Sequence, residues 1–317
     1  MYVDLCLFLE YHYIIKNKTK TNKLKYRKKQ GFNKRRETKM SMTMIKDAIY
    51  SAPFLQEMLE TTSNLYRLGW DERNGGNISY LLHEYEVLPY LNVDDVKRTV
   101  PMKFDASALA GRYFIVTGSG KYFKNVKRDP ANNLGLIRIA ADGKSYEILW
   151  GFEDGGVATS ELPTHLMNHM KRLAVDKNHR VIMHCHATNL TAMSFTHSLK
   201  EEDFTKTLWE MCTECLVVFP EGVGIIPWIV PGTNAIGEAT AEKMEDVRLV
   251  LWPHHGIFGA GTTLDETFGL IETAEKAAEV YTIVCAQGGK KQTITDAQLQ
   301  ELADAFGVNP RKGVLNL

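Results

Sequence analysis

Apolar residues recur at helical spacing in three stretches of the chain. Between residues 53 and 68 the leucines roughly follow the 3.6-residue period, and Pro53 stands in the first turn, where helices accept proline. Thr263-Leu-Asp-Glu266 has the pattern of a capping box and precedes an amphipathic segment that reaches about residue 285. Thr159-Ser-Glu-Leu-Pro163 opens a third segment, which ends near residue 174. We expect a helix in each place.

Short apolar, β-branched or aromatic runs predict the strands of a sheet. They are a segment ending near residue 82 and residues 113–117, 134–139, 146–150, 181–183, 216–219, 222–227 and 248–252. Asp142-Gly143 is typical of a hairpin turn, and residues 84–112 predict a long loop with short elements. This pattern indicates an α/β protein with a central, largely antiparallel sheet flanked by helices. No repeat or Pro/Ser-rich linker divides residues 45–317, so we expect a single domain there.

Charge is distributed unevenly along the chain. The 317 residues include 38 basic and 38 acidic side chains, but residues 1–39 hold 12 of the basic and only three of the acidic ones. Residues 40–317 therefore carry a formal charge of −9. Because nucleic-acid binding needs a clustered positive surface, an acidic body argues against nucleic acid as the main partner. A hydrophobic content of 44% and a charged content of 24% are ordinary for a globular protein.

Residues 1–39 form a basic leader of unusual composition. They are rich in Lys, Asn, Tyr, Ile and Phe and lack Ala and Pro, which is the bias of A/T-rich codons. Since Met40, Met42 and Met44 follow, we expect a disordered leader or a mis-assigned start. The alternative is a functional basic tail for nucleic acid or a membrane. In residues 1–39 the charges follow the apolar stretch, whereas an export signal has them before it, so we expect no export signal. The apolar stretch is also shorter than the ~20 residues of a membrane span, so we expect no membrane anchor.

Five cysteines in a chain of this length indicate a reducing compartment. The number is odd and no export signal accompanies it, so we expect a cytoplasmic protein. Cys212-Thr-Glu-Cys215 has C-x-x-C spacing, but no second pair completes a four-cysteine zinc site. We interpret the two thiols as packing groups beside an apolar strand.

Histidines near two strand ends form the first candidate site. His184 and His186 are two residues apart on a predicted strand, so both imidazoles point to the same face. A zinc ion needs at least a third ligand, for which His255 before Gly256 is the best candidate, and Glu161 at a helix entry could add a carboxylate. H-x-H alone on a strand is more often structural than metal-binding. With His255 and Glu161 added, a metal site and a structural role are equally open.

Turns rich in Gly, Ser, Thr and Asn form the second candidate site. Gly118-Ser-Gly-Lys121 follows a strand but lacks the full P-loop pattern, so it does not predict a nucleotide site. Such a turn still offers backbone N–H groups and a hydroxyl to a phosphate, and Asn74-Gly-Gly-Asn77 and Thr159-Ser160 offer further neutral donors. Each turn alone is more often a plain turn or helix cap.

These motifs together resemble a known family. Gly76-Asn-Ile-Ser79, Thr117-Gly-Ser-Gly120, Ser160-Glu161, His184-Cys-His186 and His255-Gly256 occur in the order seen in the class II aldolase/adducin family. The likeness runs from about residue 45 to the end. Longer blocks, such as Gly69-Trp-Asp-Glu-Arg-Asn-Gly-Gly-Asn77 and Leu264-Asp-Glu-Thr-Phe-Gly-Leu270, are more specific than H-x-H. The resemblance implies a three-layer α/β/α fold.

The resemblance also implies an activity and residue roles. It implies zinc-dependent cleavage of a ketose 1-phosphate, L-rhamnulose 1-phosphate, into dihydroxyacetone phosphate and L-lactaldehyde, a step of rhamnose metabolism. One zinc per subunit would be bound by His184, His186 and His255, with Glu161 as a displaceable fourth ligand and catalytic group. Glu214 would be a second catalytic carboxylate, delivered from the neighbouring subunit of a homotetramer. The implied substrate and phosphate contacts are Asn74, Asn77, Ser119, Gly120, Thr159 and Ser160.

Two other functions share the same fold. A pentulose-phosphate 4-epimerase or a related sugar-phosphate lyase would use the same metal ligands, and only the longer blocks distinguish these enzymes. A non-catalytic binding module would have lost the metal, which the intact ligand set speaks against. His254 adjoins His255 where the family has an aromatic residue, and we choose His255 as the ligand because Gly256 follows it.

Overall fold

The computed structural model describes residues 48–317, so the basic leader predicted at residues 1–39 lies outside the described part. The chain divides into two compact units, Met1–Ser51 and Ala52–Leu317. In the first unit the described residues include one 3₁₀ helix, η1 (Ile49–Ser51). The second unit carries the fold and the candidate site. Among the described residues, every helix is too short or too polar to cross a membrane.

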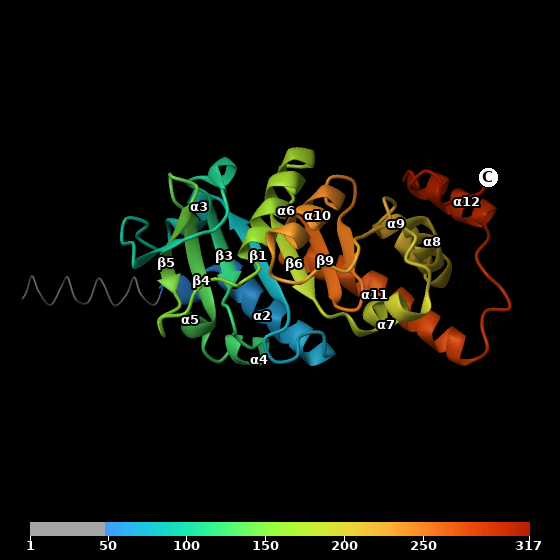
Figure 1. Cartoon of the computed structure of the whole chain (residues 1–317), viewed down its shortest axis with the longest axis horizontal. Coiled ribbons are helices and arrows are strands. Elements are labelled where there is room, and N and C mark those ends of the chain that lie inside the picture. The colour runs from blue at the N-terminus through green and yellow to red at the C-terminus, as the bar shows by residue number, and fades with distance from the viewer. Residues whose placement is uncertain (1–47) are drawn as a thin grey trace, which may run out of the picture. The chain divides into compact units, whose positions relative to one another are not determined.

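Nine strands within residues 48–317 form one mixed sheet, drawn in Figure 1. The strands are β1 (Asn77–Leu82), β2 (Arg98–Pro101), β3 (Tyr113–Thr117), β4 (Leu134–Ile139), β5 (Ser145–Gly151), β6 (Val181–Cys185), β7 (Val223–Ile225), β8 (Leu249–Trp252) and β9 (Gly256–Gly261). Their order is β2-β5-β4-β3-β1-β6-β9-β8-β7. Every neighbouring pair is antiparallel except β7 and β8. The largely antiparallel sheet predicted from the hairpin pattern is confirmed.

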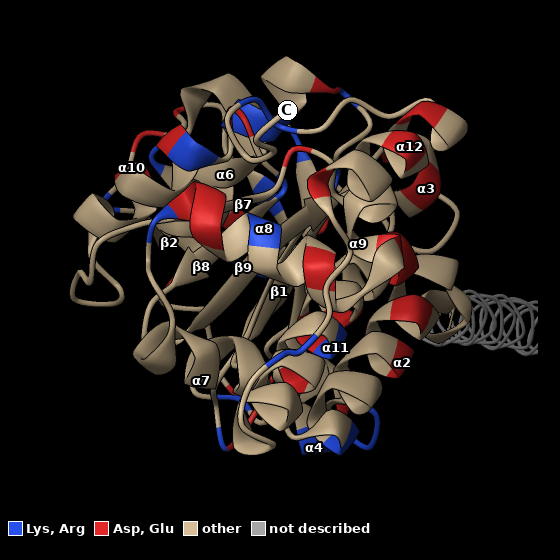
Figure 2. Ribbon diagram, turned by 90° about the vertical axis from the view of Figure 1, so that its right-hand side faces the viewer, with Lys and Arg blue, Asp and Glu red and all other residues tan. Residues whose placement is uncertain are grey.

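Helices connect and cover these strands. They are α2 (Pro53–Leu68), α3 (Glu84–Val87), α4 (Phe123–Val126), α5 (Pro130–Asn133), α6 (Leu162–Val175), α7 (Thr188–Thr196), α8 (Glu201–Met211), α9 (Thr213–Val218), α10 (Asn234–Lys243), α11 (Leu264–Ala286) and α12 (Asp296–Phe306), with the 3₁₀ turn η2 (Ser107–Leu109). Figure 2 shows that acidic and basic residues are distributed over several of these helices.

Helices α6 and α10 cover one face of the sheet. Leu166 of α6 packs against the centre of β3 and β4, and Ile236 of α10 packs against Phe258 of β9. Since side chains alternate along a strand, Gly259 faces the other side, where it contacts Ile271 of α11. Helix α2 lies beside α11 in this second layer (Figure 1). The result is the expected single domain of three layers.

Most predicted elements are confirmed, with shifted ends. Helix α2 occupies the predicted residues, α6 begins at Leu162, and α11 begins after Thr263, whose hydroxyl accepts the N–H of Glu266 at 3.1 Å. The strand predicted to start at residue 181 and to carry His184-Cys-His186 ends at Cys185. The Asp142-Gly143 hairpin joins β4 and β5, with Gly143 at φ +64°, where a glycine is favoured.

One predicted strand is wrong. Residues 216–219 belong mainly to helix α9, so the Cys212–Cys215 pair lies at the start of a helix and not beside a strand. Apolar runs of this length do not distinguish a buried strand from a short buried helix. Cys215 is buried and Cys212 is half-buried, and both are free thiols.

Candidate metal centre and active site

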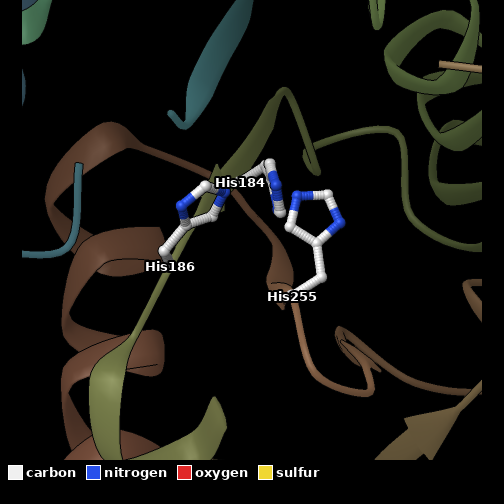
Figure 3. A group of neighbouring side chains, drawn as sticks. All are labelled: His184, His186 and His255. Atoms are coloured by element: carbon white, nitrogen blue, oxygen red, sulfur yellow. The ribbon is translucent and has the colours of Figure 1, made fainter. Parts of the chain in front are cut away.

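The sheet brings three histidines from two chain segments together. His184 is the fourth residue of β6 and His186 follows the end of that strand. His255 lies in the tight turn between β8 and β9, and β9 pairs with β6, so the turn lies beside the end of β6. One ligand nitrogen from each ring lies within 4.8 Å of the others, as the convergent rings in Figure 3 illustrate.

Hydrogen bonds on the far side of two rings fix their orientation. The Nδ1 of His184 lies 3.0 Å from the carbonyl oxygen of Ile257, to which it can donate. The Nδ1 of His186 lies 2.9 and 3.0 Å from the two carboxylate oxygens of Glu72. In both rings Nε2 then keeps its lone pair for a cation, and the carboxylate or carbonyl partner makes that nitrogen more basic.

Neutral, unpartnered imidazoles make the cluster suited to a divalent metal. Burial, followed by the neighbouring histidines, lowers the pKa of His184 well below its ordinary value, and burial lowers the pKa of His255 to about 4. Both rings are therefore neutral at pH 7, as metal ligands must be. The Nε2 of His184 and the Nδ1 of His255 are buried and have no hydrogen-bond partner within residues 48–317. A bound cation would satisfy such an orphaned nitrogen.

Two glycines give the imidazoles their room. A Cβ on Gly75 would lie 2.7 Å from Cε1 of His186, and a Cβ on Gly256 would lie 3.0 Å from Cε1 of His184. The loop that carries Gly75 is fixed to the same histidine, because the N–H of His186 donates to the carbonyl of Trp70 at 2.8 Å. Any larger residue at either glycine would displace a ring of the cluster.

Glu161 reaches the same region from the start of α6. Its Oε2 accepts a hydrogen bond from Nδ2 of Asn77 at 3.0 Å, and Asn77 is paired with His184 across β1 and β6. Burial raises the pKa of Glu161, while the Asn77 hydrogen bond and the charge of His186 oppose that rise. A carboxylate with a raised pKa is suited to proton transfer near neutral pH.

Two of the three turns predicted to contact phosphate lie side by side. The bridge between Gly118 and Ala158 places the turn containing Ser119 and Gly120 beside Thr159 and Ser160. The N–H of Ser119 donates to Val157 O at 2.9 Å, and Thr159 Oγ1 accepts the N–H of Glu161 at 3.2 Å. Asn74 precedes Gly75, which adjoins His186. The amide of Asn77, which is also predicted to contact the substrate, donates to Glu161.

Glu214 and His254 lie outside the histidine cluster. Glu214 is exposed in the first turn of α9, outside the histidine cluster, and accepts a hydrogen bond from Sγ of Cys212 at 3.1 Å. The pKa of Glu214 is lowered, chiefly by that hydrogen bond. His254 packs on Phe195 with a ring separation of 4.1 Å and contacts Ser194, so His255 is the one that joins the cluster.

Sequence reasoning missed the residues that hold the site in place. Glu72, which orients His186, and Ser79 stand within the motifs named above but carry no predicted role, and His165 belongs to none of those motifs. A usable signal exists for the last pair. Glu161 and His165 are four residues apart, and Asn77 and Ser79 are two apart, which places each pair on one face of a helix or strand.

The fold and a histidine cluster that could hold a metal ion are the features of a metal-dependent aldolase of class II. The family model "Class II Aldolase and Adducin N-terminal domain" matches residues 56–282, and the chain belongs to the class II aldolase/adducin family. A sugar-phosphate aldolase from Thermotoga maritima has a similar solved structure, with a TM-score of 0.66 and 30% identity over 76% of this chain and 98% of that one.

Individual relatives carry a more specific name. The rhamnulose-1-phosphate aldolase of Listeria monocytogenes is 67% identical over 273 residues, which cover 86% of this chain and 100% of the relative. That of Enterococcus faecalis is 67% identical over 84% of this chain and 96% of its own length. That of Pectobacterium carotovorum is 53% identical over 85% of this chain and 99% of its own length.

Proposed function

We propose that this chain is a zinc-dependent aldolase that reversibly cleaves L-rhamnulose 1-phosphate to dihydroxyacetone phosphate and L-lactaldehyde in rhamnose catabolism. The observation that carries this proposal is 67% identity to rhamnulose-1-phosphate aldolases over their whole length. The free thiols of Cys185, Cys212, Cys215 and Cys285 are compatible with a reducing cytoplasm, where we place the reaction.

His184, His186 and His255 would hold one zinc ion per subunit. Three imidazole nitrogens with an open fourth position are the ligand set of a catalytic zinc site. When bound, the ion supplies Lewis-acid polarisation of the oxygens of the ketose and of its cleavage product. Glu161 would be the fourth ligand of the resting enzyme and would be released when substrate binds.

Glu161 would then move the proton at carbon. Cleavage of the carbon–carbon bond turns the neighbouring hydroxyl into the aldehyde of L-lactaldehyde, and the proton of that hydroxyl passes to water. The electron pair of the broken bond stays on the dihydroxyacetone phosphate half, and the carboxyl group of Glu161 returns a proton to that carbon. In the condensation direction the carboxylate removes the same proton. The raised pKa of Glu161 supports both roles, since burial makes the protonated form more accessible than in an ordinary carboxyl group.

The remaining predicted residues would position the substrate. Asn74, Ser119, Gly120, Thr159 and Ser160 offer hydroxyl, amide and backbone donors to the phosphate, far from the breaking bond. Asn77 would act near the carbon end through its contact with Glu161. Glu214, exposed on α9, would reach the site of a neighbouring copy in a homotetramer.

The test is product formation by the purified protein. L-rhamnulose 1-phosphate is supplied with and without a zinc chelator, and release of dihydroxyacetone phosphate is followed. We expect release that chelation abolishes and added zinc restores. His255→Ala should lose both zinc and activity, whereas the adjacent His254→Ala should keep zinc. Absence of release, release indifferent to chelation, or a 4-epimer as the product would overturn the assignment.

A further inference from the structure

A line of buried polar side chains crosses the contact between strand β1 and helix α6. Asn77 and Ser79 lie on the same face of β1 because they are two residues apart. Glu161, His165 and His169 lie on one face of the helical turn because they are four residues apart. The two sets interleave, so that each strand residue lies between two helix residues.

Hydrogen bonds join all five residues in one chain. Nδ2 of Asn77 donates to Glu161 Oε2 at 3.0 Å, and the Asn77 Oδ1 is hydrogen-bonded to Nε2 of His165. Nδ1 of His165 lies 2.7 Å from Oγ of Ser79, and that oxygen lies 2.8 Å from Nε2 of His169. Ser79, His165 and His169 are buried.

The chemistry of these groups determines which atom donates and which accepts in each hydrogen bond. An ionised Glu161 only accepts, so Asn77 must turn its NH₂ toward it and its oxygen toward His165. Nε2 of His165 must then carry a proton. Burial lowers the pKa of His165 to about 3, so the ring is neutral and its Nδ1 accepts the Ser79 hydroxyl proton. Ser79 in turn accepts from Nε2 of His169.

Stability alone does not account for this arrangement. The row of hydrogen bonds ends at Nδ1 of His169, a buried nitrogen without a hydrogen-bond partner among the described residues. The flanking core of β3, β4 and α6 is apolar, with residues such as Phe114, Ile137 and Leu166. Apolar side chains would avoid the cost of an unsatisfied buried group. The polar line is therefore better explained by what it does at Glu161.

We propose that Ser79 and His165 are positioning residues that fix the orientation of the Asn77 amide and hence the place of the Glu161 carboxylate. This inference rests on the proposed role of Glu161 in proton transfer. Without the Ser79 hydroxyl, neutral His165 can move its proton to Nδ1, and the Asn77 amide can then turn its oxygen toward Glu161. Two facing oxygens repel, so the carboxylate leaves its place.

The first test is the kinetics of Ser79→Ala. We expect kcat and the exchange of solvent deuterium into dihydroxyacetone phosphate to fall together by about 10- to 100-fold, since a misplacement of about 1 Å in a reacting group has effects of this size. KM and zinc content should stay within about twofold, because the Ser79 hydroxyl bonds to His165 and His169 and the three histidines proposed to hold zinc are unchanged. Unchanged kcat in Ser79→Ala, with an active wild type, would overturn the proposal.

Matched variants separate positioning from loss of stability. Leu166→Ala, in the same helix but in the apolar core, should lower the melting temperature and leave kcat unchanged at a temperature where the variant is folded. His165→Gln keeps an N–H donor for Asn77 and should retain more kcat than His165→Leu. Equal kcat in the two His165 variants would contradict a positioning role.

A spectroscopic readout makes the inference independent of catalysis. Nitrogen NMR of the histidine rings in the metal-free protein should find His165 protonated at Nε2 in the wild type and shifted toward Nδ1 in Ser79→Ala. If the wild type releases no dihydroxyacetone phosphate, the proposed function fails while this measurement still decides the hydrogen-bond chain. If His165 is protonated at Nδ1 in the wild type, the proposed directions of these hydrogen bonds are wrong.

Discussion

At the scale of single residues, the histidine cluster depends on partners that are not themselves ligands. His186 follows the end of β6, so the strand no longer restrains its ring, and the carboxylate of Glu72 takes over that task. Glu72 is largely exposed, with 66% of its side chain accessible, so its effect on the ring is partly screened by water.

We predict that Glu72→Ala weakens zinc binding by about tenfold, the low end of what such outer partners contribute. The reason is that Nδ1 of His186 loses the acceptor that fixes the ring and its tautomer. Competition with a chelator of known affinity measures the change. Glu60→Ala, an exposed carboxylate on α2, is the matched control and should bind zinc like the wild type. Equal affinity in both variants would show that Glu72 does not orient His186.

How far the sequence predicts the site differs from residue to residue. His184 and His186 share a face through strand alternation, and Gly256 marks His255, so the cluster could be expected from local rules and the family likeness. The role of Glu72 could not be expected in this way, and the spacing of Ser79 from Asn77 and of His165 from Glu161 indicates only a shared face. Their roles depend on which loop and helix lie against β1 and β6, and tertiary packing decides that.

At the scale of elements, periodicity works best where the pattern is long. Helices α2 and α11 follow an extended apolar period, and both were predicted. Residues 216–219 form too short an apolar run to distinguish strand from helix, and they belong to α9. Helix α12 was not predicted from the pattern, although Thr295 and Gln298 form a capping box at its start. A capping box can therefore reveal a helix whose apolar pattern alone does not predict it.

The contact between β1 and α6 should make the protein sensitive to acid. Burial lowers the pKa of His169 well below its ordinary value of 6.5, so below pH 6.5 the unfolded chain takes up a proton that the folded chain does not. The free energy of unfolding therefore falls as the pH falls. Each such histidine contributes a slope of up to about 1.4 kcal/mol per pH unit.

We predict that His169→Leu flattens this dependence by up to that amount between pH 6 and pH 4. Urea unfolding of the metal-free protein at fixed protein concentration, repeated at several pH values, measures the slope. The variant can be less stable at pH 7, because Ser79 loses a hydrogen-bond donor, without affecting the comparison of slopes. Parallel curves for wild type and variant would show that His169 titrates normally in the folded protein.

At the scale of the whole molecule, the net charge does not indicate the charge of the proposed substrate. Residues 40–317 carry a formal charge of −9, yet the proposed substrate is a phosphate ester. An acidic protein must attract such a ligand locally, and we assign that role to neutral donors in the turns that contain Ser119 and Thr159. The balance of 38 basic and 38 acidic residues over the entire chain therefore says little about the active site.

The proposed tetramer leads to a quantitative prediction. Glu214 lies on α9, outside the histidine cluster of its own subunit, and we assign it to a neighbour's site. His255→Ala and Glu214→Ala should each be nearly inactive alone. In a ring assembled at random from equal amounts of both, a site works only when its own subunit keeps His255 and its donor keeps Glu214. One site in about four meets both conditions.

Mixed tetramers should therefore recover about a quarter of wild-type activity. The two variants are unfolded together, refolded and assayed, and native mass spectrometry verifies a mixed tetramer. The same variants refolded separately and then mixed form the control, which should stay inactive unless subunits exchange. If mixed tetramers form and remain inactive, then Glu214 and the histidines serve the same subunit's site, and the assignment of Glu214 to a neighbour is wrong.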